Sequence, residues 1–205
     1  MSSSPTAAAA VKAAKSQLRS LIKSRLAALS AEQRSSKSGI IVQKLLASDR
    51  YRSAKRISVY LSMPEEVDTA GIVADIFNSG RRLFVPRYSR GGGMEMLAVS
   101  GREDLASLPV TKWGIRQPGL EPGSPAREEG LENGGLDLII VPGLAFCQAD
   151  GARLGRGMGY YDRYLARARA ANPACAAVAI AFSDQLVDSV PTGDSDQPLD
   201  DIVTD

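Results

Sequence analysis

The chain has 205 residues, 44% of them hydrophobic, so it is long enough to bury one ordinary core. Its most hydrophobic segment, LDLIIVPGLAF, falls well short of the roughly 20 apolar residues that a membrane-spanning helix needs, so we expect no membrane association. The absence of histidine excludes Ser-His-Asp catalysis, Cys-His catalysis and histidine-based zinc sites. Any catalysis must therefore use other groups.

The charges are unevenly distributed, although the net charge is only +2. Residues 1–56 contain twelve Lys and Arg but only two acids, whereas residues 184–205 contain seven aspartates and no basic residue. This distribution favours an anion near the first segment and a metal cation near the last. The alternative is a solvated basic face and a solvated acidic tail. The many acids outside the first segment argue against nucleic-acid binding.

The cysteines and the first residues bear on the compartment. Cys147 and Cys175 are too few for a disulfide framework and lack C-x-x-C spacing, which predicts a reducing compartment, the cytoplasm. The chain begins with a basic stretch rich in Ser and Ala, as an organellar transit peptide does. Only residues 1–10 precede the first helical pattern, so we expect a short flexible extension there and a single domain over residues 11–205. Import into a mitochondrion or another organelle is the minor alternative.

Two helices are predicted before any strand. The first begins near Val11, where apolar residues recur at steps of three and four. Lys12, Lys15, Arg19 and Lys23 share the face beside this apolar stripe. The motif SAEQ has capping-box spacing, which predicts a second helix from about Ala31 to beyond Leu46.

A βαβ unit and an edge strand follow. Residues 56–63 have alternating apolar side chains among residues that favour β-structure, which predicts a strand. Residues 68–80 have an aspartate cap, an apolar face and a terminal glycine, which predicts a helix. Residues 81–88 predict a second strand, parallel to the first. Residues 91–99, with the sequence GGGMEMLAV, predict a turn and a short strand at the edge of the sheet.

The remaining elements complete the fold class. Residues 109–135 are rich in Pro and Gly and predict a long loop, which Trp113 is expected to pin to the core. The apolar runs 136–142 and 176–182 predict buried strands, and residues 159–171 predict a helix between them. The fold class is α/β: a single doubly wound, mostly parallel sheet of five or six strands flanked by helices, with two N-terminal helices and a long Pro/Gly-rich loop.

The segment RLGRGMGYYDRYL, residues 153–165, carries the strongest functional signal. Its three alternate glycines follow the predicted central strand and precede a helix, at the carboxyl end of a parallel sheet, where α/β proteins bind ligands. Backbone N–H groups at a helix N-terminus attract phosphate, and Arg153 and Arg156 add positive charge. The spacing matches neither the P-loop nor the dinucleotide motif, and a sharp structural turn is the alternative. The segment therefore predicts an anion site.

The longer string VPGLAFCQADGARLGRGMGYYDRYL resembles the signature of the 5-formyltetrahydrofolate cyclo-ligases, also called 5,10-methenyltetrahydrofolate synthetases. Similar segments are KSQLR, KRISVYLSMPEEVDT, FVPRY, LPVTKWGIRQP and GGLDLIIVPG. These motifs occur in the family's order and span nearly the whole chain. The resemblance implies conversion of 5-formyltetrahydrofolate to 5,10-methenyltetrahydrofolate, with ATP as co-substrate, Mg²⁺ as cofactor, and release of ADP and phosphate.

The resemblance also implies an ATP site and a metal site. In this family the ATP phosphates are held between the first helix and the glycine loop. The matching ATP-binding residues are Lys15, Arg19, Arg153, Leu154, Gly155, Arg156, Gly157, Met158, Gly159, Tyr160 and Tyr161. The matching Mg²⁺ ligands are Asp162 and Asp196, whose carboxylate oxygens suit this hard cation, with Asp194 as the alternative to Asp196.

The folate site is implied in the same way. The matching substrate-binding residues are Leu61, Glu66, Arg156, Gly157, Met158, Gly159 and Tyr160. Leu61 could instead be an ordinary core residue, and Glu66 could instead favour the positive end of the next helix. Some family members have a lysine where this chain has Met158, so one positive charge is missing from the loop.

The reaction that the family performs needs no protein nucleophile. The γ-phosphoryl group of ATP is transferred to the formyl oxygen, N10 of the same folate attacks, and phosphate leaves. The protein aligns the reactants and neutralises charge, with Arg153, Arg156 and Tyr160 as the expected catalytic residues and Tyr160 orienting the formyl group. The expected partners are therefore small molecules, and the size of the chain favours a monomer. A nucleotide-binding module without turnover and a nucleic-acid binder are the rival hypotheses.

Overall fold

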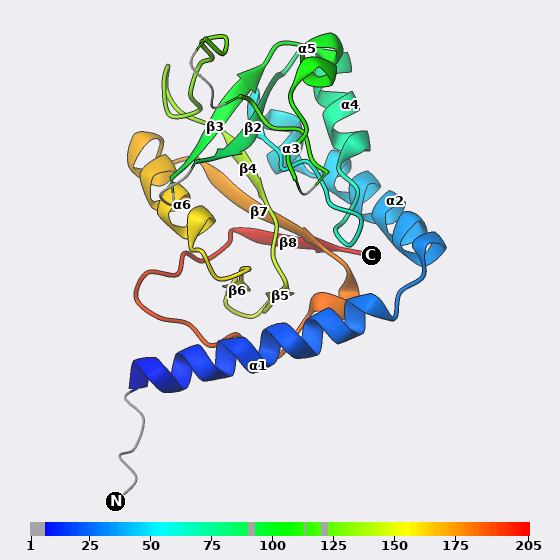
Figure 1. The fold of residues 1–205 in the computed structure, drawn as a ribbon, viewed down its shortest axis with the longest axis vertical. Coiled ribbons are helices and arrows are strands. Elements are labelled where there is room, and N and C mark those ends of the chain that lie inside the picture. Colours follow the sequence, from blue (N-terminus) through cyan, green and yellow to red (C-terminus); the bar gives the residue numbers. More distant parts are fainter. Residues whose placement is uncertain (1–6, 90–92, 113, 120–122) are drawn as a thin grey trace, which may run out of the picture.

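A computed structural model describes residues 7–89, 93–112, 114–119 and 123–205 (Figure 1). Three helices precede the first strand: α1 (Ala7–Ala27), α2 (Ala31–Ala47) and α3 (Asp49–Ser53). Helix α1 begins before the expected start at Val11, because the alanines that precede this residue are good helix formers.

The capping box of α2 is confirmed. The Ser30 hydroxyl accepts a hydrogen bond from the Gln33 N–H, and the Gln33 side-chain oxygen accepts one from the Ser30 N–H. The short helix α3 was not predicted. It begins because the Ser48 hydroxyl accepts the N–H of Tyr51 and so caps a new turn directly after α2.

A six-stranded sheet with the strand order β3-β2-β1-β4-β7-β8 forms the centre of the molecule. The strands are β1 (Arg56–Ser58), β2 (Arg82–Tyr88), β3 (Met94–Val99), β4 (Leu138–Val141), β7 (Ala176–Ala181) and β8 (Asp201–Thr204). Strand β3 is antiparallel to β2 at one edge, and the other neighbouring strands are parallel. The predicted mostly parallel α/β sheet is therefore confirmed.

Alternate residues of the central strands face opposite sides of the sheet, and helices cover both sides (Figure 1). In β4, Leu138 and Ile140 belong to the hydrophobic core that also contains residues of α2 and α4 (Ala70–Asn78). Ile139 and Val141 belong to a second core, built with α6 (Tyr160–Ala171). Burial on both faces explains the continuous apolar run of this strand and confirms a doubly wound fold.

The first βαβ unit differs from its prediction in two details. Strand β1 ends at Ser58, well before position 63, although the Val59 N–H still donates to the Phe84 carbonyl of β2. Helix α4 has Thr69, not Asp68, as its N-cap residue, while the Asp68 carboxylate accepts the first N–H of the helix. Gly80 follows the helix with a φ of 67°, a left-handed conformation that glycine adopts without strain.

The long loop is confirmed where the structure describes it. Among the described residues between Pro109 and Gly135 there is no helix or extended strand, and α5 (Arg102–Ser107) precedes this stretch. The expected anchoring role of Trp113 and most of the turn expected near residue 91 lie outside the described residues. No helix in the described part of the chain is long and apolar enough to cross a membrane.

A two-stranded hairpin that was not predicted joins the sheet to α6. It consists of β5 (Ala145–Phe146) and β6 (Arg153–Leu154). In its turn, Gly151 has a φ of 69°, and its carbonyl accepts the N–H of Leu199. A Cβ atom at Gly151 would lie 2.4 Å from the Leu199 carbonyl oxygen. Only glycine therefore lets the hairpin bind the acidic C-terminal segment this closely.

We predict that Gly151→Ala lowers the free energy of unfolding by about 1–3 kcal/mol, because alanine is strained at this φ and collides with Leu199. Gly39→Ala is the matched control, since Gly39 lies inside α2 and a Cβ atom there would have nothing within 4 Å. The control should raise the free energy of unfolding by about 0.5–1 kcal/mol. Urea denaturation measures both, and wild-type stability of Gly151→Ala would contradict the assignment.

Candidate active site

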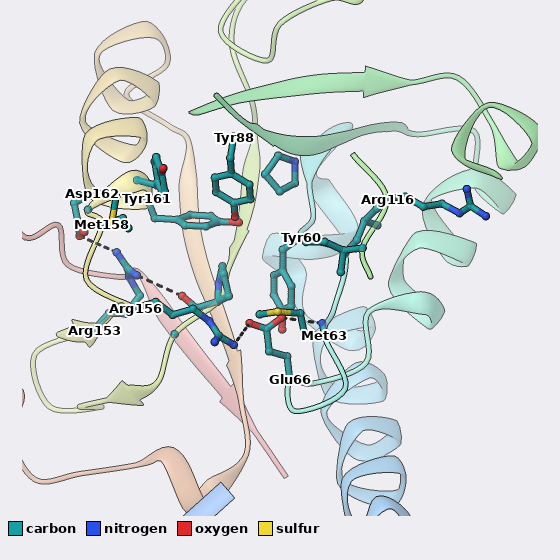
Figure 2. Close-up of a pocket in the computed structure, with 18 residues that line it drawn as sticks. Tyr60, Met63, Glu66, Tyr88, Arg116, Arg153, Arg156, Met158, Tyr161 and Asp162 are labelled. Carbon is teal, nitrogen blue, oxygen red and sulfur yellow. Dashed lines mark hydrogen bonds and ion pairs between the residues drawn. The ribbon is translucent and has the colours of Figure 1, made fainter. Parts of the chain in front are cut away.

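A cavity of about 430 Å³ opens at the carboxyl ends of β1 and β4 (Figure 2). The strand order runs from β1 to β2 on one side and from β4 to β7 and β8 on the other. In open α/β sheets, ligands bind at such a reversal of strand order, just beyond the carboxyl ends of the strands. Tyr60 and Leu61 enter the cavity after β1, and Pro142 and Gly143 enter it after β4. The topology therefore places a binding site here.

One half of the cavity is aromatic and apolar. Tyr60, Tyr88, Tyr160 and Tyr161 line it, and the rings of Tyr88 and Tyr160 are tilted with their centroids 5.0 Å apart. Burial raises the pKa of Tyr88 to about 12, so its hydroxyl is protonated at neutral pH. Such a surface suits a flat, largely apolar ring system with a few polar atoms.

The glycine loop reaches across the cavity through Arg156. Its guanidinium donates to the carboxylate of Glu65 at 3.2 Å and to that of Glu66 at 3.0 Å, both in the loop between β1 and α4. Glu66 also accepts the N–H of Met63, which fixes its carboxylate at the cavity wall. The side chain of Glu66 is mostly buried, whereas that of Glu65 is half-exposed. Glu66 is therefore the carboxylate that a ligand in the cavity would meet.

Two ion pairs lie beside the aromatic half. Arg153 donates to Asp162 at 2.8 Å, and Lys15 donates to Asp196 at 2.5 Å. The backbone N–H of Gln197 donates to the same Asp162 oxygen, at 3.3 Å, so the two pairs are neighbours. These four side chains come from β6, α6, α1 and the C-terminal segment. They bring two cations and two carboxylates, far apart in sequence, to one place.

Arg153 is the most buried cation of the group, at 6% exposure. It donates one hydrogen bond to Asp162 and a longer one, at 3.4 Å, to the Pro142 carbonyl. Its Nε is buried and has no hydrogen-bond partner among the described residues. A buried donor without a partner is costly, so this arginine is prepared to bind an acceptor such as a phosphate oxygen.

The glycine loop itself closes around Arg19. The Nε of Arg19 donates to the Gly155 carbonyl at 2.9 Å, which ties α1 to the loop. Gly157 has a φ of 111°, and a Cβ atom there would lie 3.7 Å from the Arg19 guanidinium carbon. Gly159 is the N-cap residue of α6, so the N–H groups that begin this helix face the same region. Loop amides and arginines together form a surface for anions.

The structure brings most of the candidate residues together. Those that line the cavity are Leu61, Glu66, Arg153, Gly155, Arg156, Met158, Gly159, Tyr160, Tyr161 and Asp162. Lys15, Arg19, Gly157 and Asp196 lie directly beside it through the contacts described above. Leu154 is different, because its side chain is buried in the core and its carbonyl accepts the N–H of Leu144.

Sequence reasoning missed part of the cavity wall. Tyr60, Met63, Pro86, Tyr88 and Pro142 line it but were not predicted as site residues. All of them lie in segments that resemble the family, SVYLSMPEE, FVPRY and LDLIIVPG, so a signal was present. Their role depends on β1 ending early and on β2 lying beside it. The residue pattern predicts the second feature but not the first.

The two aspartates could accommodate a magnesium ion together with a polyphosphate. No group of three or more acids, histidines or cysteines that could hold a metal ion occurs among the described residues. Mg²⁺ commonly binds through one or two carboxylates plus substrate phosphates, so Asp162 and Asp196 suffice. Asp194 is exposed, whereas Asp196 pairs with Lys15 beside Arg153, which favours Asp196 as the second ligand. The residues therefore fit this ion.

Fold and site together define an α/β protein with a composite pocket, aromatic on one side and rich in paired charges on the other. The 5-formyltetrahydrofolate cyclo-ligase family model matches residues 11–205. A Mus musculus 5-formyltetrahydrofolate cyclo-ligase is 44% identical, over 96% of both chains. A Caenorhabditis elegans protein named probable 5-formyltetrahydrofolate cyclo-ligase is 33% identical, over 95% of this chain and 94% of the relative.

A solved structure agrees with these relatives. The 5,10-methenyltetrahydrofolate synthetase of Aquifex aeolicus superimposes with a TM-score of 0.72 and 29% identity, over 92% of this chain and 88% of that chain. The chain therefore belongs to the 5-formyltetrahydrofolate cyclo-ligase family.

The ion pair of Asp196 gives a direct test of the site geometry. Burial raises the pKa of the Asp196 carboxyl. Lys15 and the Gly193 N–H lower it by a larger amount, so the pKa lies below its ordinary value of 3.8. Because the pKa is depressed in the folded state, the pair stabilises the protein fully at pH values above the pKa of Asp196 in the unfolded state. This stabilisation is lost as the pH falls through the pKa of the folded state.

We predict that Lys15→Met raises the pKa of the Asp196 carboxyl, since the hydrogen bond and the charge of Lys15 are lost while burial, the Gly193 bond and the nearby Arg153 charge remain. Carboxyl-selective NMR titration measures this value. Lys12→Met serves as the control, because Lys12 is exposed on the same helix. An Asp196 pKa that is equal in wild type and Lys15→Met would show that the pair does not form in solution.

Proposed function

We propose that the protein converts 5-formyltetrahydrofolate to 5,10-methenyltetrahydrofolate, using ATP and Mg²⁺ and releasing ADP and phosphate. Family membership supports the overall reaction. One observation supports the use of ATP: a buried arginine with an unpartnered donor and two paired carboxylates adjoin an aromatic pocket at the sheet's ligand-binding edge. A polyphosphate and a pterin need these two environments side by side.

The ATP phosphates would be bound by Lys15, Arg19 and Arg153 and by the backbone amides of the glycine loop. All three cations already point toward this loop or toward the carboxylates next to it. When bound, Mg²⁺ would neutralise phosphate charge, with Asp162 and Asp196 as its protein ligands. In the free protein the ion pairs neutralise each of these charges, and the nucleotide and the metal would replace the partners when they bind.

The folate would occupy the aromatic half of the cavity. Its pterin ring would pack among the tyrosines, with Leu61 as an apolar contact and the Glu66 carboxylate as acceptor for the ring's N–H groups. Arg156 lies across the opening, bonded to both Glu65 and Glu66. It can keep Glu65 as a partner when the pterin binds Glu66, and so close the opening over the substrate. The exposed Met158 lies at the same rim.

The chemistry follows from this arrangement. The formyl oxygen attacks the γ-phosphorus of ATP, and ADP leaves. N10 of the same folate then adds to the formyl carbon, the carbon–oxygen bond breaks, phosphate carries that oxygen away, and N10 loses its proton. The substrate provides its own nucleophile, so the protein needs only to align the reactants and balance charge. Arg153 and Arg156 align the reactants and balance charge, and Tyr160 orients the folate near its formyl group.

The remaining assignments follow from the same picture. Both cysteines are unpaired and buried thiols, which is in keeping with a reducing compartment, so we place the protein in the cytoplasm. We take the working form to be a monomer that acts on small molecules. Lys15 and Arg19 turn toward the pocket, which removes them from the basic face that nucleic-acid binding would need.

The proposed function predicts a defined product. Purified protein mixed with 5-formyltetrahydrofolate and Mg-ATP should produce methenyltetrahydrofolate, which is followed by its near-ultraviolet absorbance. Omission of either ATP or the metal should abolish the signal. ATP binding without product would instead support a nucleotide-binding module that has lost turnover, and Met158→Lys would then be the next variant to assay.

We further predict that Arg19→Ala raises the KM for ATP by about tenfold or more, because it removes a cation that the loop holds next to the phosphates. The KM for folate should change much less. Lys23→Ala, an exposed lysine one turn further along α1, is the control and should leave both constants unchanged. Steady-state kinetics with each substrate varied in turn distinguishes the two effects. An unchanged KM for ATP in Arg19→Ala would refute the proposed phosphate contact.

A further inference from the structure

The hydroxyl of Tyr161 is a buried polar group without a partner. The residue is 6% exposed, and its Oη has no hydrogen-bond partner among the described residues. The Tyr88 hydroxyl lies beside it as a weak acceptor, in a contact that falls short of the geometry of a hydrogen bond. A tyrosine hydroxyl carries its proton at neutral pH. It is therefore an available donor.

Other buried tyrosines of the chain are satisfied. Tyr164, one turn later on the same helix, donates to Glu129 at 2.9 Å, and Tyr51 donates to Asp75 at 2.7 Å. Tyr60 donates to the Val67 carbonyl at 3.4 Å. Native proteins rarely leave such a group unpaired, because the unmade bond costs free energy of folding. An unpartnered hydroxyl that lines a ligand cavity therefore indicates a partner supplied by the ligand.

The position of this hydroxyl is specific. The Arg153 guanidinium lies over the Tyr161 ring, 5.8 Å from its centroid, on the side of Asp162. The ring extends from there toward Tyr88 and lines the cavity between the two (Figure 2). Tyr161 thus lies at the junction of the two halves of the site.

We propose that the Tyr161 hydroxyl donates a hydrogen bond to the formyl oxygen of the folate. This inference rests on the function proposed above. The formyl oxygen is the substrate atom that must face both the folate pocket and the γ-phosphate, so it belongs at that junction. A carbonyl oxygen has two lone pairs: one accepts a hydrogen bond from the tyrosine hydroxyl, and the other attacks phosphorus. Tyr161 is therefore a folate-contacting residue as well as part of the glycine-loop segment assigned to ATP.

The test compares Tyr161→Phe with Tyr164→Phe, which remove chemically identical hydroxyls from one helix. For Tyr161→Phe we expect kcat/KM for 5-formyltetrahydrofolate to fall about tenfold, mainly through KM, with the KM for ATP unchanged. Its urea midpoint should be equal to or higher than that of wild type, because no internal bond is lost. Tyr164→Phe should show the reverse: a lower midpoint and unchanged kinetics.

A second measurement identifies the atom that is bound. Fluorescence titration should show that Tyr161→Phe weakens 5-formyltetrahydrofolate about tenfold and leaves tetrahydrofolate, which lacks the formyl group, unaffected. Equal weakening of both ligands would overturn the formyl assignment. Unchanged folate KM, or a midpoint as low as that of Tyr164→Phe, would overturn the contact itself. If wild type had no turnover at all, the proposed function would fail, while the titration would still decide whether Tyr161 contacts the formyl group.

Discussion

The ion pair between Arg153 and Asp162 is the contact on which the geometry of the site depends. It joins β6 to the first turn of α6, and so defines the path of the glycine loop between them. Because the Gln197 N–H also donates to Asp162, the same carboxylate holds the C-terminal segment that carries Asp196. Asp196 in turn holds Lys15 of α1. Two carboxylates, Asp162 and Asp196, thus connect four segments that are distant in sequence.

This network places two different environments, one charged and one aromatic, next to each other at one edge of the sheet. The strand reversal between β1 and β4 provides the pocket, and residues that continue from these strands form its aromatic wall. The glycine loop then brings charged groups to the open side of the same pocket, and α1 closes over the loop through Arg19. Two of the four buried side-chain atoms without a hydrogen-bond partner among the described residues, Arg153 Nε and Tyr161 Oη, are found where the two environments meet. Such groups reduce the stability of the free protein, and ligands can recover that loss.

Much of the fold could be predicted from the sequence because local signals agreed with the tertiary structure. The capping box at Ser30 and the apolar run of β4 are examples of patterns that depend on neighbouring residues or on simple burial. The early end of β1 could not be predicted, since it depends on the pocket that the following residues must line. The β5–β6 hairpin was missed because its strands have two residues each. The glycines and arginines of the loop predicted an anion site, which stays a prediction, whereas the partners of Asp162 and Asp196 come from segments that only the folded chain brings together.

The transfer of the formyl oxygen to phosphate is the central chemical claim, and isotope labelling tests it most directly. 5-Formyltetrahydrofolate labelled with ¹⁸O in its formyl group would be converted with Mg-ATP, and the released phosphate would be analysed by mass spectrometry. The account predicts one ¹⁸O atom in each phosphate for each methenyl group formed. Unlabelled phosphate, with the ¹⁸O recovered in water, would contradict phosphorylation of the formyl oxygen and the alignment of the two ligands that the site is proposed to provide.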